Sequence, residues 1–172
     1  VLPWIENGYL KVAGPTSKSA IYSFTLGGTS RFSAAIDLPH HCRTPLISGV
    51  ALSHWLGPDP NVTPKHDVAY MQATELVPSY MATVSPTAYA VVGGESPYGT
   101  YVGLPTTYTP LQQGNFTYST DYMGSGGYQS PIGLLPEHDV LYLTTTAPVA
   151  YGAVVRNGYS AGRYAIHYRD ET

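Results

Sequence analysis

Charged side chains are scarce in this chain of 172 residues, because only 11% of them are Asp, Glu, Lys or Arg and the net charge is −3. An average soluble domain carries about 25%. Nucleic-acid binding depends on clustered basic groups, so this composition argues against a nucleic-acid partner. It also leaves much uncharged surface, which suits a protein that lives in contact with other proteins.

Cysteine and long apolar runs are scarce as well. A single cysteine, Cys42, excludes an intrachain disulfide. No apolar run approaches the ~20 residues that span a bilayer, and the segment Val1-Leu2-Pro3-Trp4 lacks the basic and apolar regions of a signal peptide. A chain of this length buries about 70% of its unfolded surface. We therefore expect a single domain over residues 1–172 that folds without disulfides.

Apolar and polar residues alternate at several places, with the period of a half-buried strand. Residues 20–26 and 31–38 alternate on either side of Gly27-Gly28, which predicts a hairpin with a tight turn. We expect its buried face to consist of Tyr22, Phe24, Leu26, Phe32, Ala34, Ile36 and Leu38.

The rest of the chain also favours strands over helices. A tight turn is predicted at Asn157-Gly158, the strongest hairpin signal in the sequence. The pattern predicts an all-β sandwich or barrel of about eight to ten antiparallel strands, with long loops and little or no helix. Further strands are expected at residues 46–56 (a central strand), 68–76, 80–92, 115–122, 139–146, 149–155 and 163–168.

Two segments look like excursions from this scaffold. Residues 1–19 are apolar but broken, which predicts an arm that packs on its own chain or reaches a neighbour. Residues 96–136 hold one charge, Asp121, among 41 residues rich in Tyr, Gly and Pro, so they form a long loop that contacts a partner or packs on its own barrel. The candidate interface residues are Trp4, Tyr9, Tyr98, Tyr101, Tyr108, Tyr118, Tyr122 and Tyr128.

Patterns with catalytic or metal-binding chemistry are weak. His40-His41-Cys42 is the one cluster of metal-ligand type, but adjacent residues on an extended segment point to opposite sides. Residues 158–162 match G-x-S-x-G, yet a hairpin turn is expected before them and a strand after them, which is the wrong context for a nucleophile elbow. Glu137 and Asp139 would share one face of a strand. A glycosidase needs two carboxylates several ångströms apart in a cleft, which a sequence alone cannot show. We expect no enzyme activity, no metal and no cofactor.

The Val-Leu-Pro-Trp start, the length and the Tyr/Pro/Gly-rich body resemble the smaller major capsid proteins of tailless, membrane-containing icosahedral phages of Thermus. This resemblance spans the whole chain and rests on these general features, not on a diagnostic motif. It implies a single jelly-roll fold, a place in the virion, a homodimer, a second capsid protein as companion and an internal membrane close by. It implies no catalytic residues.

A second function of another class is a carbohydrate- or receptor-binding β-sandwich, such as a phage fibre tip. Exposed aromatic rings stack on sugar faces, and Trp55 together with the tyrosines of residues 98–128 would supply them.

Overall fold

The computed structural model describes residues 1–8, 16–75, 104–114 and 137–163. They fall into two compact units. The first takes its described residues from 1–61, 106–114 and 155–163, and the second from 62–75, 104–105 and 137–154. The division falls between Val154 and Val155, inside a continuous helix, and the expectation of a single domain over residues 1–172 stays a prediction.

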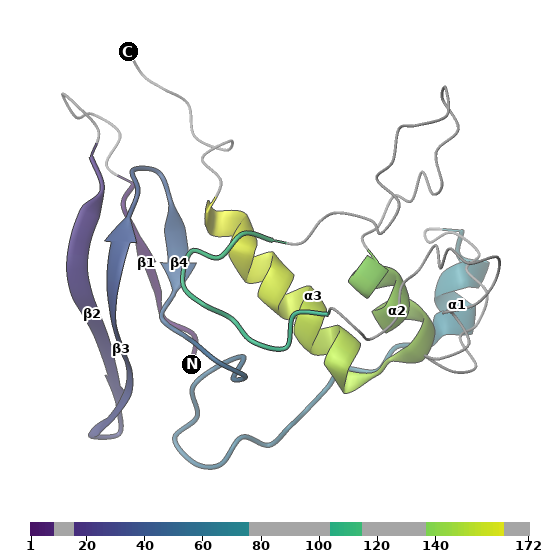
Figure 1. Ribbon diagram of the computed structural model, residues 1–172. Coiled ribbons are helices and arrows are strands. Elements are labelled where there is room, and N and C mark those ends of the chain that lie inside the picture. Colours follow the sequence, from purple (N-terminus) through teal and green to yellow (C-terminus); the bar gives the residue numbers. More distant parts are fainter. Residues whose placement is uncertain (9–15, 76–103, 115–136, 164–172) are drawn as a thin grey trace, which may run out of the picture. The chain divides into compact units, whose positions relative to one another are not determined.

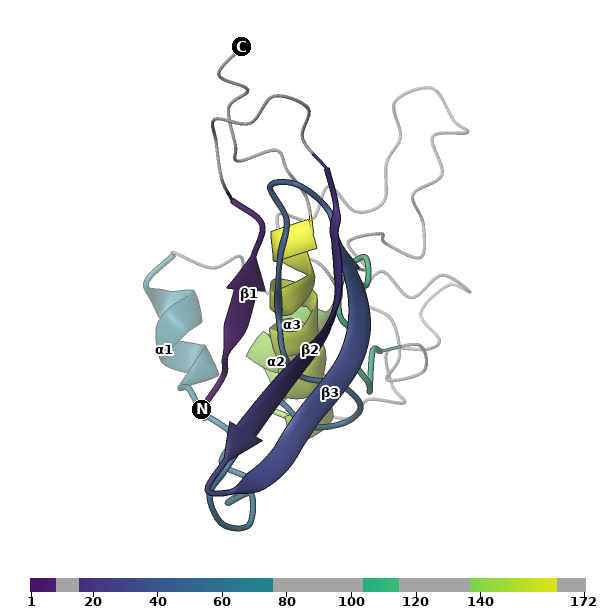
Figure 2. The ribbon, with the colours of Figure 1, turned by 90° about the vertical axis from the view of Figure 1, so that its left-hand side faces the viewer.

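The predicted hairpin is present in the first unit. Strand β2 (Lys18–Leu26) pairs antiparallel with β3 (Thr29–Leu38), in a register that places Phe24 opposite Phe32. The two strands lie side by side along their length (Figure 1; Figure 2). Gly27 and Gly28 have φ angles of 59° and 77°. Two successive positive φ values belong to the tight hairpin turns whose twist matches the strands, which is why glycine occupies both positions.

The face prediction for this hairpin is confirmed. Phe32, Ile36 and Leu38 are buried, and Tyr22, Phe24 and Ala34 pack partly buried against them. Ile21, on the opposite face of β2, is 75% exposed. Side chains alternate across a strand, so the alternation in the sequence identified the inner face.

A second strand pair was missed by the sequence analysis. Strand β1 (Trp4–Glu6) pairs antiparallel with β4 (Arg43–Pro45). Backbone bonds extend this pairing at both ends, because Leu46 N donates to Pro3 O at 2.8 Å and Asn7 N donates to Cys42 O at 3.0 Å. Of the two alternatives for the arm, packing on its own chain is therefore the one seen for these residues.

The strand predicted at residues 46–56 is wrong, because only its first residues enter the core. Leu46 and Ile47 are buried, whereas Val50 and Leu56 are each 73% exposed. Gly49 has a φ of 71°, a left-handed conformation that turns the chain out of an extended path.

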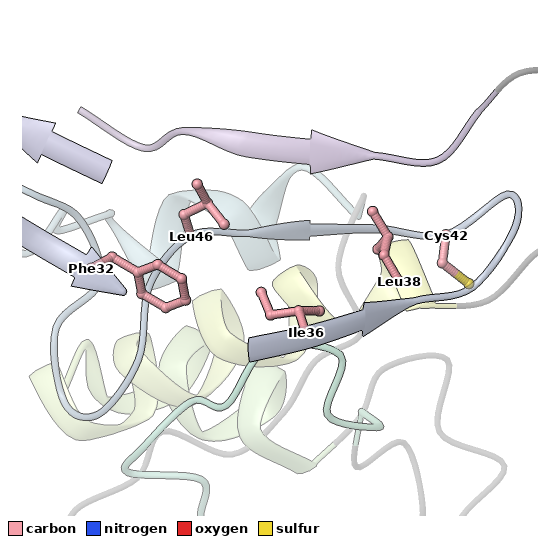
Figure 3. Packing of buried hydrophobic residues seen from close by; sticks show 5 residues of the cluster. All are labelled: Phe32, Ile36, Leu38, Cys42 and Leu46. Carbon is pink, nitrogen blue, oxygen red and sulfur yellow. The ribbon is translucent and has the colours of Figure 1, made fainter. Parts of the chain in front are cut away.

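The core of the first unit lies between the two strand pairs. In Figure 1, β1 and β4 lie between the hairpin and the C-terminal end of helix α3 (Pro148–Ser160), whose Tyr159 contacts Trp4 of β1. Ile5 of β1 and Leu111 of the loop 104–114 pack against the cluster. Figure 3 shows its five buried members, Phe32, Ile36, Leu38, Cys42 and Leu46.

Three helices stand where strands were predicted. They are α1 (Val68–Ala73), α2 (Glu137–Thr145) and α3, which continues as the 3-10 turn η2 (Ala161–Arg163). The strands expected at 68–76, 139–146 and 149–155, the turn at Asn157-Gly158 and the expectation of little or no helix are therefore wrong for these residues.

Local capping and burial explain these helices. The Asp67 carboxylate accepts from Tyr70 N at 3.0 Å and caps α1. Pro148 begins α3, at a position where its missing N–H costs nothing. The buried residues of α3 include Ala150, Ala153, Asn157 and Ser160, at helical spacings of three and four. Burial along this stripe outweighs the weak helix propensity of Val, Asn and Gly.

Small antiparallel sheets and a few short helices thus make up the described fold, which confirms the β-rich antiparallel part of the prediction. The strands predicted at 80–92 and 115–122, and all but the first residue of the one at 163–168, lie outside the described residues.

Candidate functional site

The predicted interface residues that the structure describes are Trp4 and Tyr108, and they differ sharply. Trp4 is 41% exposed, whereas Tyr108 is 1% exposed. The prediction that Tyr108 is a surface contact is therefore wrong. The other predicted contacts, Tyr9, Tyr98, Tyr101, Tyr118, Tyr122 and Tyr128, lie outside the described residues.

Tyr108 anchors the described part of the tyrosine-rich loop to the first unit. Its backbone N and O bond reciprocally with Gly49, at 2.9 Å each, and its hydroxyl lies 3.0 Å from the Thr44 hydroxyl. Burial raises the pKa of the Tyr108 phenol, and the hydrogen bond to Thr44 partly offsets this. Residues 106–114 therefore pack on their own chain, which is the second of the two alternatives for the loop.

Trp4 lies in a cluster of aromatic and charged side chains that the sequence analysis missed. The Tyr159 ring of α3 stands perpendicular to the Trp4 ring, with centroids 5.8 Å apart. The guanidinium carbon of Arg43 lies 5.7 Å from the Trp4 ring centroid, a cation–π contact. Glu6 is directly opposite Arg43 in the β1–β4 register, and both are exposed. We call Trp4, Glu6, Arg43 and Tyr159 the Trp4 cluster.

A second exposed feature is the segment of residues 50–56, which we call the apolar loop. Val50 and Leu56 are 73% exposed and Trp55 is 42% exposed. Backbone carbonyls of the loop accept hydrogen bonds from side chains of the same unit: Arg156 donates to Val50 O, Tyr159 to Leu52 O at 2.6 Å and Arg31 to Leu56 O at 3.4 Å. The loop is thus held by its backbone while apolar side chains face outward.

The polar patterns singled out in the sequence do not form a reactive centre within the described residues. Burial raises the pKa of the Cys42 thiol, which donates to Arg163 O at 2.8 Å. A thiol held protonated is a poor nucleophile and a poor metal ligand. Among the residues described, no three His, Cys, Asp or Glu side chains gather as metal ligands would.

Ser160 of the G-x-S-x-G match is fully buried and its hydroxyl donates to Arg156 O at 3.2 Å. It ends helix α3 and does not sit on the predicted turn. A nucleophile must reach its substrate from a strand-to-helix elbow, so this serine has neither the exposure nor the context for that role.

In α2 the side chains of His138 and Asp139 lie 3.8 Å apart. Burial lowers the pKa of His138, and the neighbouring carboxylate partly opposes this. Burial also raises the pKa of Asp139, and the imidazolium partly opposes that shift. Burial thus disfavours the charged form of each group, which is the effect expected for side chains on a packed helix face.

Comparisons with protein-family models, curated proteins and solved structures gave no match to this chain. Across the described ranges, no helix combines the length and the apolar character required to cross a bilayer.

Proposed function

We propose that the chain is a structural subunit of a viral capsid, with a single jelly-roll fold to which the described antiparallel pairs belong. In this proposal it associates with itself and with a second capsid protein to build an icosahedral shell around an internal membrane, and it has no enzymatic role. Its place is the virion.

The observation that carries the proposal is the apolar loop. Val50, Trp55 and Leu56 present apolar surface to solvent, while hydrogen bonds from the Arg156 and Tyr159 side chains hold the backbone of the loop in place. A contact surface that is already held in place loses little conformational entropy on binding. Tryptophan is also among the residues that contribute most to protein interfaces.

The charge composition supports the same function. With only 11% charged residues, copies of the chain repel one another weakly. The loop itself, from Val50 to Leu56, contains no Asp, Glu, Lys or Arg. Shell assembly needs contacts that are individually modest and act together, and a small apolar loop on each copy supplies such contacts.

The test is assembly in cells that co-express this chain with its companion capsid protein, followed by electron microscopy of the purified material. We expect shell-like particles with the natural chain and at least a tenfold lower yield with the double variant Val50→Ser/Leu56→Ser. Ile21→Ser is the matched control, because Ile21 is 75% exposed on a different surface of the same unit. Absence of particles with the natural chain, or equal loss with Ile21→Ser, would contradict the proposal.

A further inference from the structure

The Trp4 cluster gathers complementary chemistry on one face of the β1–β4 pair. Trp4 and Glu6 are two residues apart on a strand and therefore share a face. Arg43 joins them from the opposite strand, where directly paired side chains have Cβ atoms about 5 Å apart. The Arg43 guanidinium, a donor-only group, lies over the Trp4 ring, and the Glu6 carboxylate, an acceptor-only group, extends along β1 toward Gly8 on the same face.

The cluster is built on rigid supports. β1 is held at both ends by backbone bonds to residues 42 and 46. Tyr159 fixes the Trp4 ring from the side, and its own hydroxyl is committed to Leu52 O at 2.6 Å. Gly162 lies so close to Arg43 that an added Cβ would be 2.6 Å from the Arg43 carbonyl. The platform is therefore preorganised before any ligand arrives.

We propose that the Trp4 cluster binds a pyranose ring of an uncharged oligosaccharide. The apolar C–H face of the sugar stacks on the accessible part of the Trp4 ring, since Trp4 as a residue is 41% exposed. Vicinal hydroxyls of the sugar both donate and accept, so they bond to the Glu6 carboxylate and the Arg43 guanidinium at the same time. This inference is independent of the proposed function, because the chain can bind an oligosaccharide whether or not it assembles into a shell.

The chain contains two tryptophans, and their surroundings separate two kinds of partner. Trp4 is 41% and Trp55 is 42% exposed, so exposure alone does not distinguish them. Trp55 adjoins Leu56, 73% exposed, in a loop without charged side chains, which suits an apolar protein contact. Trp4 adjoins the Arg43 guanidinium, and Glu6 is paired with Arg43 in the β1–β4 register, a mixture of groups that matches the hydroxyls of a small polar ligand.

The two-tryptophan composition also makes the test specific. Variant Trp55→Phe leaves Trp4 as the sole source of tryptophan emission. We would titrate it with three probes, cellohexaose, maltohexaose and chitohexaose, and record the emission of Trp4. We expect a saturable spectral change with at least one probe, and the same affinity by calorimetry for the natural chain and Trp55→Phe.

Variants of the polar partners then test the assignment of the site. Glu6→Gln and Arg43→Gln should each weaken binding about tenfold, while circular dichroism stays unchanged because both side chains are exposed. Trp4→Phe should weaken it further, since a smaller ring covers less of the sugar.

Three results would overturn the inference. The first is unchanged Trp4 emission with each of the three probes at 10 mM, and the second is an affinity for the probes that depends on Trp55 and not on Trp4. The third is a change of Trp4 emission that occurs only when copies of the chain associate. The last result would assign the cluster to a protein contact.

Discussion

The β2–β3 hairpin and the segment 137–160 have similar sequence patterns but different structures. Both are rich in apolar and β-branched residues, and both contain a glycine-bearing turn signal, Gly27-Gly28 in one and Asn157-Gly158 in the other. The first forms two paired strands around its turn, whereas the second forms helices α2 and α3 and places Asn157-Gly158 inside α3.

The difference shows which signal can be relied on. In the hairpin the alternation contrasts large apolar residues with Ser, Thr and charged residues, so only one face can be buried. In α3 the buried residues are small or polar, such as Ala150, Ala153 and Ser160, and they do not stand out from their neighbours in hydrophobicity. When the buried positions of a helix are small residues, their spacing is easily mistaken for the pattern of a strand.

The largest expected effect tests the buried face of the hairpin. Phe32→Ala should lower the free energy of unfolding by about 3–5 kcal/mol, because it leaves a cavity in the cluster with Ile36 and Leu46. Ile21→Ala, on the exposed face, should change it by less than about 0.5 kcal/mol. Urea unfolding followed by circular dichroism measures both, and equal losses would contradict the face assignment.

The next effect tests the junction that follows α3. Gly162→Ala places a Cβ 2.6 Å from both Cγ and the carbonyl oxygen of Arg43, and the backbone atom has no room to move aside. We expect a loss of about 1–3 kcal/mol, the usual range for overpacking. A neutral result in the same unfolding experiment would mean that η2 and β4 are not in contact.

A smaller effect distinguishes helix from turn by its sign. An alanine Cβ at position 158 would meet nothing within 4 Å, and Gly158 lies within α3. Gly158→Ala should therefore stabilise the protein by about 0.5–1 kcal/mol. If Asn157-Gly158 formed the predicted tight turn, which needs positive φ, the same change would destabilise it.

The smallest expected effect is a pH dependence from α2. The folded-state pKa of His138 lies below its ordinary value of 6.5, because burial disfavours the imidazolium. The unfolded chain thus binds more protons as pH falls through 6.5, and stability decreases. The raised pKa of Asp139 acts with the opposite sign at lower pH, since the folded carboxyl retains a proton that the unfolded one releases.

His138→Gln should remove the loss of stability between about pH 7 and the lowered folded pKa. Thermal unfolding at closely spaced pH values measures the slope, which is compared with that of the natural chain. An unchanged slope in the variant would show that His138 does not cause it.

The sequence predicted the part of the fold that depends on large side chains in strict alternation. It could not predict β1 and β4, because three-residue strands carry too little pattern and their pairing joins residues about 40 positions apart. The central strand predicted at residues 46–56 is also wrong, because the positive φ of Gly49 ends the buried run after Ile47.

The candidate sites were predicted only in part. Trp4 was predicted as an interface residue and is exposed, but the Arg43 and Tyr159 side chains beside it come from elements distant in the sequence. Tyr108 was assigned to the surface because tyrosine is common at interfaces, yet the Thr44 hydroxyl satisfies its hydroxyl within the core. Composition cannot distinguish these two uses of a tyrosine.

The apolar loop is proposed to mediate association of the chain, and sedimentation velocity over a range of concentrations tests this role most directly. The natural chain should show reversible self-association. Leu56→Ser should weaken it at least tenfold, while Ile21→Ser, which removes a side chain of similar exposure, leaves it unchanged. A natural chain that remains monomeric at the highest concentration, or a Leu56→Ser variant that associates as well as the natural chain, would contradict the account.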